Sequence, residues 1–132
     1  MIIDQYKLIA DLMMSNGEYN FLIICRTPRQ TDIVYNWFAQ NINGDKTIHL
    51  NRPTGYIGNK KNVLHIKTNS ENVGRGRRPH LVIADVTVNE SEMRAISGYG
   101  FPPLIRDMDW EVAGLEQDLM LNKGGNLNEC YN

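Results

Sequence analysis

The sequence predicts an α/β fold, in which a mainly parallel sheet of about four strands lies between two layers of helices. Two continuous apolar runs, FLIIC at 21–25 and LVIAD at 81–85, are too short for core helices and suit strands buried on both faces. Amphipathic helical patterns separate these runs along the chain. Because buried strands that alternate with helices are typical of parallel sheets covered by helices, we expect a three-layer sandwich.

The composition is that of one globular domain. The 132 residues are 42% hydrophobic and 22% charged, which is enough to bury a core without disulfides or metals. No apolar run approaches the roughly 18 residues of a membrane span, and the first residues lack the pattern of a secretory signal. The two cysteines, Cys25 and Cys130, do not form a disulfide framework. We therefore expect a cytoplasmic protein without a membrane partner.

The first half of the chain is expected to fold as helix, strand, helix and strand. Apolar residues at helical spacing predict a helix over 3–15, and the buried strand at 21–25 follows it. Thr27 is the expected N-cap of the next helix, whose apolar stripe runs to about Ile42. A short strand is expected at 47–50.

The second half is expected to contain two strands and two helices. A loop rich in Gly, Asn and Lys over 51–62 precedes alternating apolar residues that predict a strand over 63–67. The buried strand at 81–85 comes next, and a capping pattern starts a short helix from Asn89 to Ser97. A longer helix is expected over 108–121, and the last ten residues are expected to fray.

Charge divides the chain into two parts. Residues 1–106 hold 13 Lys and Arg against 9 Asp and Glu, a net charge of +4, whereas 107–132 hold one Lys against six acids, a net charge of −5. We therefore expect a single α/β domain over 1–106, followed by an acidic helix and tail over 107–132. Such a helix is either a solvated surface or a segment that covers the basic body and competes for it.

Two arginine-rich segments are candidate contacts for nucleic acid or phosphate. The loop GRGRRPH at 74–80 contains Arg75, Arg77 and Arg78 beside two glycines. The segment RTPRQ at 26–30 follows the first apolar strand and opens a helix. Guanidinium groups suit phosphate, and the first amides of a helix favour anions. The alternative is that both segments carry ordinary surface arginines.

The strand LVIAD ends in Asp85, and an acid at this point is typical of a Walker B segment. Such an acid projects into the crevice where open α/β sheets bind ligands, and it can hold Mg²⁺. An active ATPase of this kind usually has a glutamate next, whereas Val86 follows here. The sequence also contains no Gly-x-x-x-x-Gly-Lys-Ser/Thr motif, so it has no P-loop lysine to reach nucleotide phosphates. We therefore assign Asp85 as a candidate metal ligand. We expect that the chain alone has no catalytic residue and binds no cofactor.

From residue 3 to about 97, these pieces together resemble the ATPase core of phage large terminases and related RecA-like helicases, beginning just after the P-loop. In that family a strand runs into an (A/P)-x-T-x-x-Q element, which here is CRTPRQ. A later edge strand leads to an arginine-rich stretch and the Walker B strand, which here are NVLHIK and RGRRPHLVIAD. The resemblance implies a P-loop-ATPase-like fold that lacks its P-loop. It also implies nucleic-acid backbone contacts for Arg26, Thr27 and Arg29, and the Walker B position for Asp85.

We therefore expect a catalytically inactive terminase-like or helicase-like module of phage or prophage origin, which binds nucleic acid or a motor partner through its arginines in the host cytoplasm. Two alternatives stay open. One is a protein-interaction module that inhibits or regulates a host or viral protein, with Trp110, Leu115 and Leu119 as the partner contact. The other is a subunit of a split ATPase or DNA-packaging complex, in which a partner completes a site for ATP and Mg²⁺.

Overall fold

The computed structural model of the chain describes residues 2–42, 47–59, 61–70, 79–89, 91 and 104–131, with side chains from Gln5 to Leu121 within these ranges. The strands are β1 (Asn20–Cys25), β2 (His49–Asn51), β3 (Tyr56–Gly58), β4 (Val63–Thr68), β5 (Leu81–Asp85) and β6 (Leu104–Arg106). The helices are α1 (Ile2–Met13), α2 (Pro28–Asn41) and α4 (Met108–Tyr131), with a short 3₁₀ turn, η1 (Arg52–Thr54).

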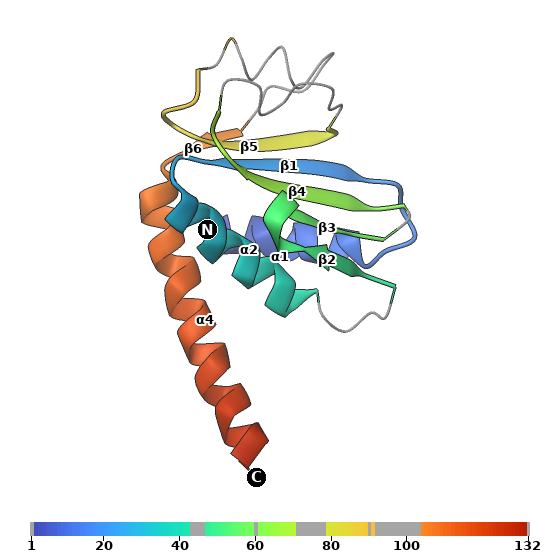
Figure 1. The fold of residues 1–132 in the computed structure, drawn as a ribbon, viewed down its shortest axis with the longest axis vertical. Helices are drawn as coiled ribbons and strands as arrows, with labels where there is room; N and C mark the ends of the chain where they lie inside the picture. The colour runs from blue at the N-terminus through green and yellow to red at the C-terminus, as the bar shows by residue number, and fades with distance from the viewer. Residues whose placement is uncertain are drawn as a thin grey trace.

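Within the described residues, the six strands form one sheet in the order β2-β3-β4-β1-β5-β6 (Figure 1). The central strand β1 pairs in parallel with β4 and β5, and β5 pairs in parallel with β6. The strands β2 and β3 form an antiparallel hairpin that extends the sheet beyond β4. The α/β class and the mainly parallel sheet are therefore confirmed.

Two strands were not expected from the sequence, and both contain only three residues. The strand β3 lies in the Gly- and Asn-rich stretch that we assigned to a loop, and β6 directly follows a Pro-Pro pair. Neither segment is long enough to show the period-two alternation that identifies a strand. Pairing with β4 and with β5 decides their structure instead.

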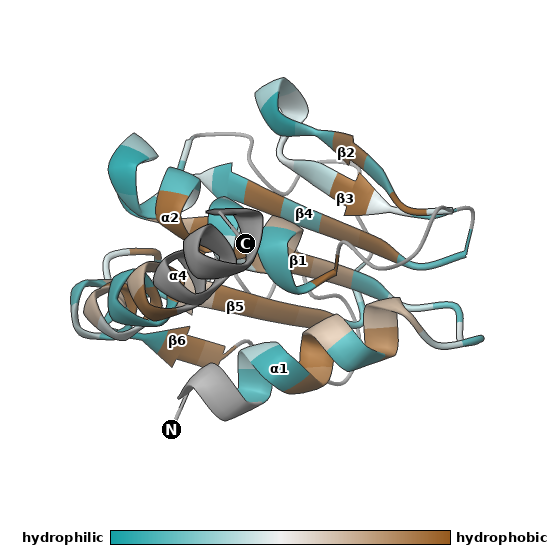
Figure 2. Cartoon of the chain, turned by 90° about the horizontal axis from the view of Figure 1, so that it is seen from below, coloured by the Kyte–Doolittle hydropathy of each residue, from teal (hydrophilic) through white to brown (hydrophobic). Residues whose placement is uncertain are grey.

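The helices α1, α2 and α4 all lie on one face of the sheet (Figures 1 and 2). Alternation along β1 explains both faces, since Phe21, Ile23 and Cys25 belong to the cluster beneath the helices. Leu22 and Ile24 point to the opposite face and form a second cluster. The third layer of the predicted sandwich falls on the helix expected from Asn89 to Ser97. Most of that segment lies outside the described residues, so this layer stays a prediction.

Aromatic side chains hold the helices on the sheet. The rings of Tyr6 and Phe38 lie 5.2 Å apart between α1 and α2, and Trp37 meets Phe38 edge to face at 4.9 Å. From α4, Met108 and Leu115 are fully buried in the same cluster. The first turns of α4 therefore share the core of the α/β domain, and the helix continues past Leu121 to Tyr131, where fraying was expected.

Candidate nucleic-acid interface

The RTPRQ segment links the carboxyl end of β1 to the start of α2. Thr27 has extended backbone angles, and its side chain accepts a hydrogen bond of 3.2 Å from the Gln30 backbone N–H. Pro28 occupies the first helical position, where a missing N–H costs nothing. Thr27 is therefore the N-cap of α2, as the sequence predicts, and its hydroxyl is engaged in the helix start.

Both arginines of this segment form ion pairs with acids of α4. Arg26 pairs with Asp109, and Arg29 pairs with Glu116 one to two turns further along α4. The Gln30 amide also donates to the Asp109 carboxylate. Because its side chain accepts a hydrogen bond from Arg26, the pKa of Asp109 is lowered from its ordinary value. The acidic helix thus pairs with the RTPRQ segment of the basic body, although the Arg29 side chain remains 72% exposed.

Three apolar side chains of α4 that we assigned to a partner contact lie in different environments. Leu115 is fully buried, and Leu119 packs partly buried against the core. Trp110, in contrast, is 82% exposed. Further along the interface with α2, the Trp37 indole N–H donates to the Asp118 carboxylate at 2.8 Å. Of the three, Trp110 is the one whose surface a partner can reach.

Asp85 is completely buried at the carboxyl end of β5. One carboxylate oxygen accepts hydrogen bonds from the Thr87 backbone N–H and hydroxyl, at 3.0 and 2.8 Å. The other accepts the Met108 backbone N–H at 3.2 Å, so the carboxylate faces the positive end of α4. Asp107 completes this helix start by accepting the N–H of Asp109.

This geometry gives Asp85 a structural role as an anchor of α4. Among the described residues, no group of three or more His, Cys, Asp and Glu side chains is placed to hold a metal ion. The metal role that we assigned to Asp85 therefore stays a prediction, and any cation at this carboxylate would compete with its three hydrogen-bond donors.

A partly buried ion pair that the sequence did not reveal lies beside this anchor. Arg106 of β6 donates to Glu111 of α4 at 3.4 Å, and Glu111 is only 8% exposed. Burial raises the pKa of Glu111 to about 7, and the Arg106 charge only partly offsets this effect. The sequence spacing holds no signal for this pair, because strand pairing and helix start together bring the two side chains into contact.

Of the second arginine-rich segment, 74–80, only its last two residues are described, and the described chain before it ends at residue 70. The Asn69 N–H donates to the Cys25 carbonyl at 2.7 Å, beside the RTPRQ segment. His80 lies at the other end of β1, where its ring nitrogen Nδ1 accepts the Asn20 N–H at 3.0 Å. Arg75, Arg77 and Arg78 lie outside the described residues, so their nucleic-acid contact stays a prediction.

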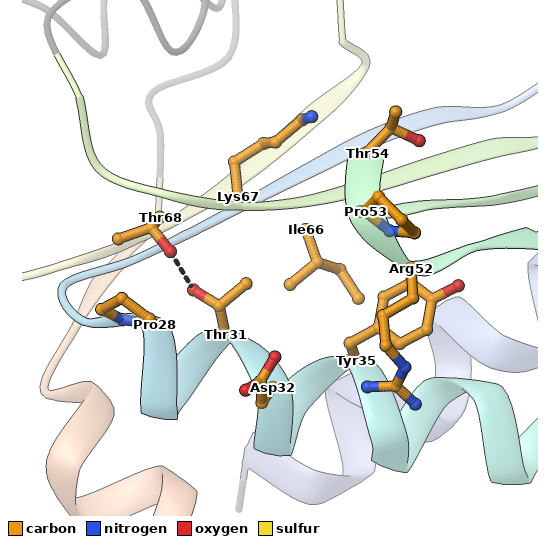
Figure 3. Close-up of a pocket in the computed structure, with 11 residues that line it drawn as sticks. Pro28, Thr31, Asp32, Tyr35, Arg52, Pro53, Thr54, Ile66, Lys67 and Thr68 are labelled. Carbon is orange, nitrogen blue, oxygen red and sulfur yellow. Dashed lines mark hydrogen bonds between the residues drawn. The ribbon is translucent and has the colours of Figure 1, made fainter.

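A cleft of about 200 Å³ opens on the side of α2 that faces away from α4 (Figure 3). One wall is a face of α2, the other is the η1 turn, and the floor is the end of β4. It is lined by Pro28, Thr31, Asp32, Tyr35, Arg52, Pro53, Thr54, Gly55, Ile66, Lys67 and Thr68. These residues come from three separate segments, which explains why no motif in the sequence indicated the cleft.

Comparison with known proteins identifies the fold of the chain but not its family. No protein-family model matches the sequence, and no curated protein matches it either. The crystal structure of the large terminase of bacteriophage HK97 is similar, with a TM-score of 0.54 at 18% identity. The match covers 74% of this chain and 25% of the terminase chain, so this chain spans about a quarter of that protein's length. The chain therefore has a terminase-like α/β fold, as the resemblance implied.

In the part of the chain that the structure describes, no helix is both long enough and apolar enough to cross a membrane.

Proposed function

We propose that this chain is a nucleic-acid-binding module with a terminase-like fold, and that it does not hydrolyse nucleotide by itself. The observation that supports binding most directly is the pairing of Arg26 and Arg29 with carboxylates of the same chain. Their guanidinium groups are placed beside the N-terminus of α2 to receive anionic oxygens, and a phosphate group has the same chemistry. Arg75, Arg77 and Arg78 remain candidate contacts that add to this surface.

The proposal of an inactive module rests on the sequence and on the surroundings of Asp85. Phosphoryl transfer is accelerated mainly by positioning and by charge stabilisation around the phosphates, which a P-loop and its lysine supply. The sequence has no such motif, and Val86 stands where a catalytic glutamate is expected. The Asp85 carboxylate is buried and accepts three hydrogen bonds. ATP and Mg²⁺ would therefore enter this fold only in the split-ATPase alternative, with a partner that completes the site.

A salt titration of binding tests this proposal. Labelled single- and double-stranded DNA and RNA are titrated with the protein at several salt concentrations. Counterion release makes the affinity fall steeply as salt rises, and Arg26→Gln with Arg29→Gln makes the slope shallower. The matched control is Lys7→Gln with Lys61→Gln, which removes the same charge from exposed positions away from α2. Absence of binding at low salt would overturn the proposal.

A second candidate function is contact with a protein partner through α4. The observation that favours it is the exposed apolar surface of Trp110, Met120 and Leu121, which are 82%, 72% and 69% exposed. Aromatic side chains are frequent anchors of protein interfaces. In a pull-down from a native lysate, Trp110→Ala should then lose a protein that the unmodified chain captures. Equal capture by both proteins would argue against a partner at Trp110.

A further inference from the structure

The cleft beside α2 is formed by one face of that helix and by a turn held rigidly over β4. Pro28, Thr31, Asp32 and Tyr35 recur at helical spacing, so they share one face of α2. Tyr35 lies beside Arg52 of the η1 turn, and Ile66 points into the space between α2 and that turn (Figure 3).

Backbone geometry fixes the η1 turn in this position. Gly55 has a φ of +68°, a conformation that side chains rarely adopt. A Cβ at this position would lie 2.0 Å from the Ile66 carbonyl oxygen, so no other residue fits there without moving β4. The Ile66 N–H donates to the Gly55 carbonyl at 2.8 Å, which ties the turn to the strand.

Side chains connect the turn to α2 as well. The Arg52 guanidinium lies 4.8 Å from the centre of the Tyr35 ring and donates to the Asn36 side chain. The Tyr35 hydroxyl donates to the Tyr56 carbonyl at 3.1 Å. The two walls of the cleft are therefore joined, and the cleft is preformed.

The lining combines an apolar interior with three charged residues, Asp32, Arg52 and Lys67. Pro28, Pro53 and Ile66 supply apolar surface, and the hydroxyls of Thr31 and Thr68 are hydrogen-bonded to each other at 2.7 Å. Lys67 also lines the cleft, but its side chain points away from α2 (Figure 3).

Asp32 is the acidic group of the cleft, and it is exposed. It forms no hydrogen bond or ion pair with the described residues. Arg52 contacts Tyr35 and Asn36, about one helical turn further along α2, or roughly 5 Å. The cleft thus offers a hydrogen-bond acceptor near one end and a cation near the other.

We propose that this cleft binds one nucleotide of a single strand, with the base between Pro28 and Pro53 and the phosphate at Arg52. Asp32 then accepts a hydrogen bond from the exocyclic amine that cytosine, adenine and guanine carry, a contact that thymine cannot make. A basic peptide would be repelled by Arg52 and an acidic one by Asp32, whereas a nucleotide carries the donor and the anion that the two charges need. This inference deepens the proposed function and rests on it.

The cleft assignment is tested by comparing the affinities of strands with different bases. Salt dependence alone does not test it, because it reports contacts with the phosphates. Fluorescein-labelled 12-mers of deoxycytidine, of deoxythymidine and of abasic deoxyribose are titrated with the full chain at one low salt concentration. A held base adds apolar contact with Pro28 and Pro53 and a hydrogen bond to Asp32, so the cytidine strand should bind several-fold more tightly than the abasic strand. Asp32→Ala should abolish the preference for cytidine over thymidine and leave the salt slope unchanged. Asp11→Ala removes the same charge from an exposed position of α1 and should change neither.

Binding of cytidine monophosphate, followed by saturation-transfer NMR, gives a readout that does not need the RTPRQ segment. If the abasic and cytidine strands bind equally, the cleft assignment is wrong while the proposed function stands. If no strand binds but cytidine monophosphate binds and is lost in Asp32→Ala, the proposed function is wrong, and the cleft is a site for a free nucleotide and not for a nucleotide within a strand. If cytidine monophosphate binds equally to Asp32→Ala and to the unmodified chain, the role of Asp32 is overturned.

Discussion

The two sides of α2 differ in how their charges are satisfied. On the side that faces α4, the arginines at the helix start are neutralised within the molecule by Asp109 and Glu116. On the side that faces η1, Asp32 has no partner among the described residues, and Arg52 lies against an aromatic ring. A ligand that uses the first side has to replace existing ion pairs, whereas a ligand that meets Asp32 in the cleft displaces no ion pair among the described residues.

A cluster of charge in the sequence therefore does not by itself identify the groups that are open to a ligand. Exposed ion pairs contribute only about 0–1 kcal/mol each, so a phosphate can replace the α4 carboxylates at little cost. The paired side therefore suits adjustable, salt-dependent binding. The open side suits selection among ligands, because its acidic group, Asp32, has no hydrogen-bond or ion-pair partner among the described residues.

The largest expected effect comes from detaching α4 from the core. Leu115→Ala removes a fully buried side chain between α4 and the sheet. Such a truncation costs about 2–5 kcal/mol of unfolding free energy, which urea denaturation measures. Met120→Ala, at a position that is 72% exposed, should change the stability by about 0.5 kcal/mol or less. Equal stabilities of the two variants would contradict the packing of α4.

A smaller, pH-dependent effect is expected at Glu111. Its folded-state pKa is raised from 4.5 to about 7, so the native state holds this proton more tightly than the unfolded chain does. The stability that this group contributes is fully present below about pH 4.5 and is lost as the pH rises through about 7. Glu111→Gln stays neutral, and its melting temperature should increasingly exceed that of the unmodified chain between pH 5 and 8. Glu18→Gln is the control at an exposed acid, and identical pH profiles for Glu111→Gln and the unmodified chain would refute this prediction.

A change of about 1 kcal/mol in the unfolding free energy is expected at the N-terminus of α2, which lies between the two sides of that helix. Thr27→Ala removes the N-cap oxygen of α2 and should lower the unfolding free energy by about that amount. Thr27→Ser keeps the oxygen and should retain most of the stability. If both variants fold equally well but bind nucleic acid differently, the hydroxyl serves ligand contact more than capping.

The smallest effect on stability is expected when Asp109 and Glu116 of α4 are replaced by neutral residues. The same change should clearly affect binding. Asp109→Asn with Glu116→Gln removes the internal partners of Arg26 and Arg29 and leaves the buried face of α4 intact. We expect a several-fold gain in nucleic-acid affinity at low salt, because the arginines no longer have to exchange a carboxylate for a phosphate. Asp11→Asn with Glu18→Gln controls for the net charge. An affinity that rises equally in this control would show that overall charge, and not α4, is responsible.

The main outline of the fold could be predicted because local pattern and tertiary structure agree. The strands β1 and β5 are continuous apolar runs, and Thr27 with Pro28 marks the start of α2. The hairpin strand β3 and the edge strand β6 could not be predicted, since their pairing partners decide their conformation. The charge difference between body and tail left open whether the acidic helix is solvated or meets the basic body, and the ion pairs of α4 show which arginines it contacts.

Less of the candidate site could be predicted, because its geometry depends on contacts between segments that lie far apart in the sequence. Asp85 was interpreted from its position at the end of a strand, whereas its hydrogen-bond partner Met108 lies 23 residues away. The Arg106–Glu111 pair and the cleft depend on contacts between segments, and no spacing in the sequence reports such contacts. Sequence reasoning found the basic groups and missed what surrounds them.

The contact between Trp37 and Asp118 gives the chain an internal optical reporter. Trp37 is fully buried and donates its indole N–H to α4, whereas Trp110 on the same helix is largely in water. The two indoles should therefore emit at different wavelengths and respond unequally to a dissolved quencher. With Trp110 replaced by Phe, the remaining emission comes from the boundary between α2 and α4, so a red shift on adding nucleic acid would report that the acidic helix moves away from its arginines.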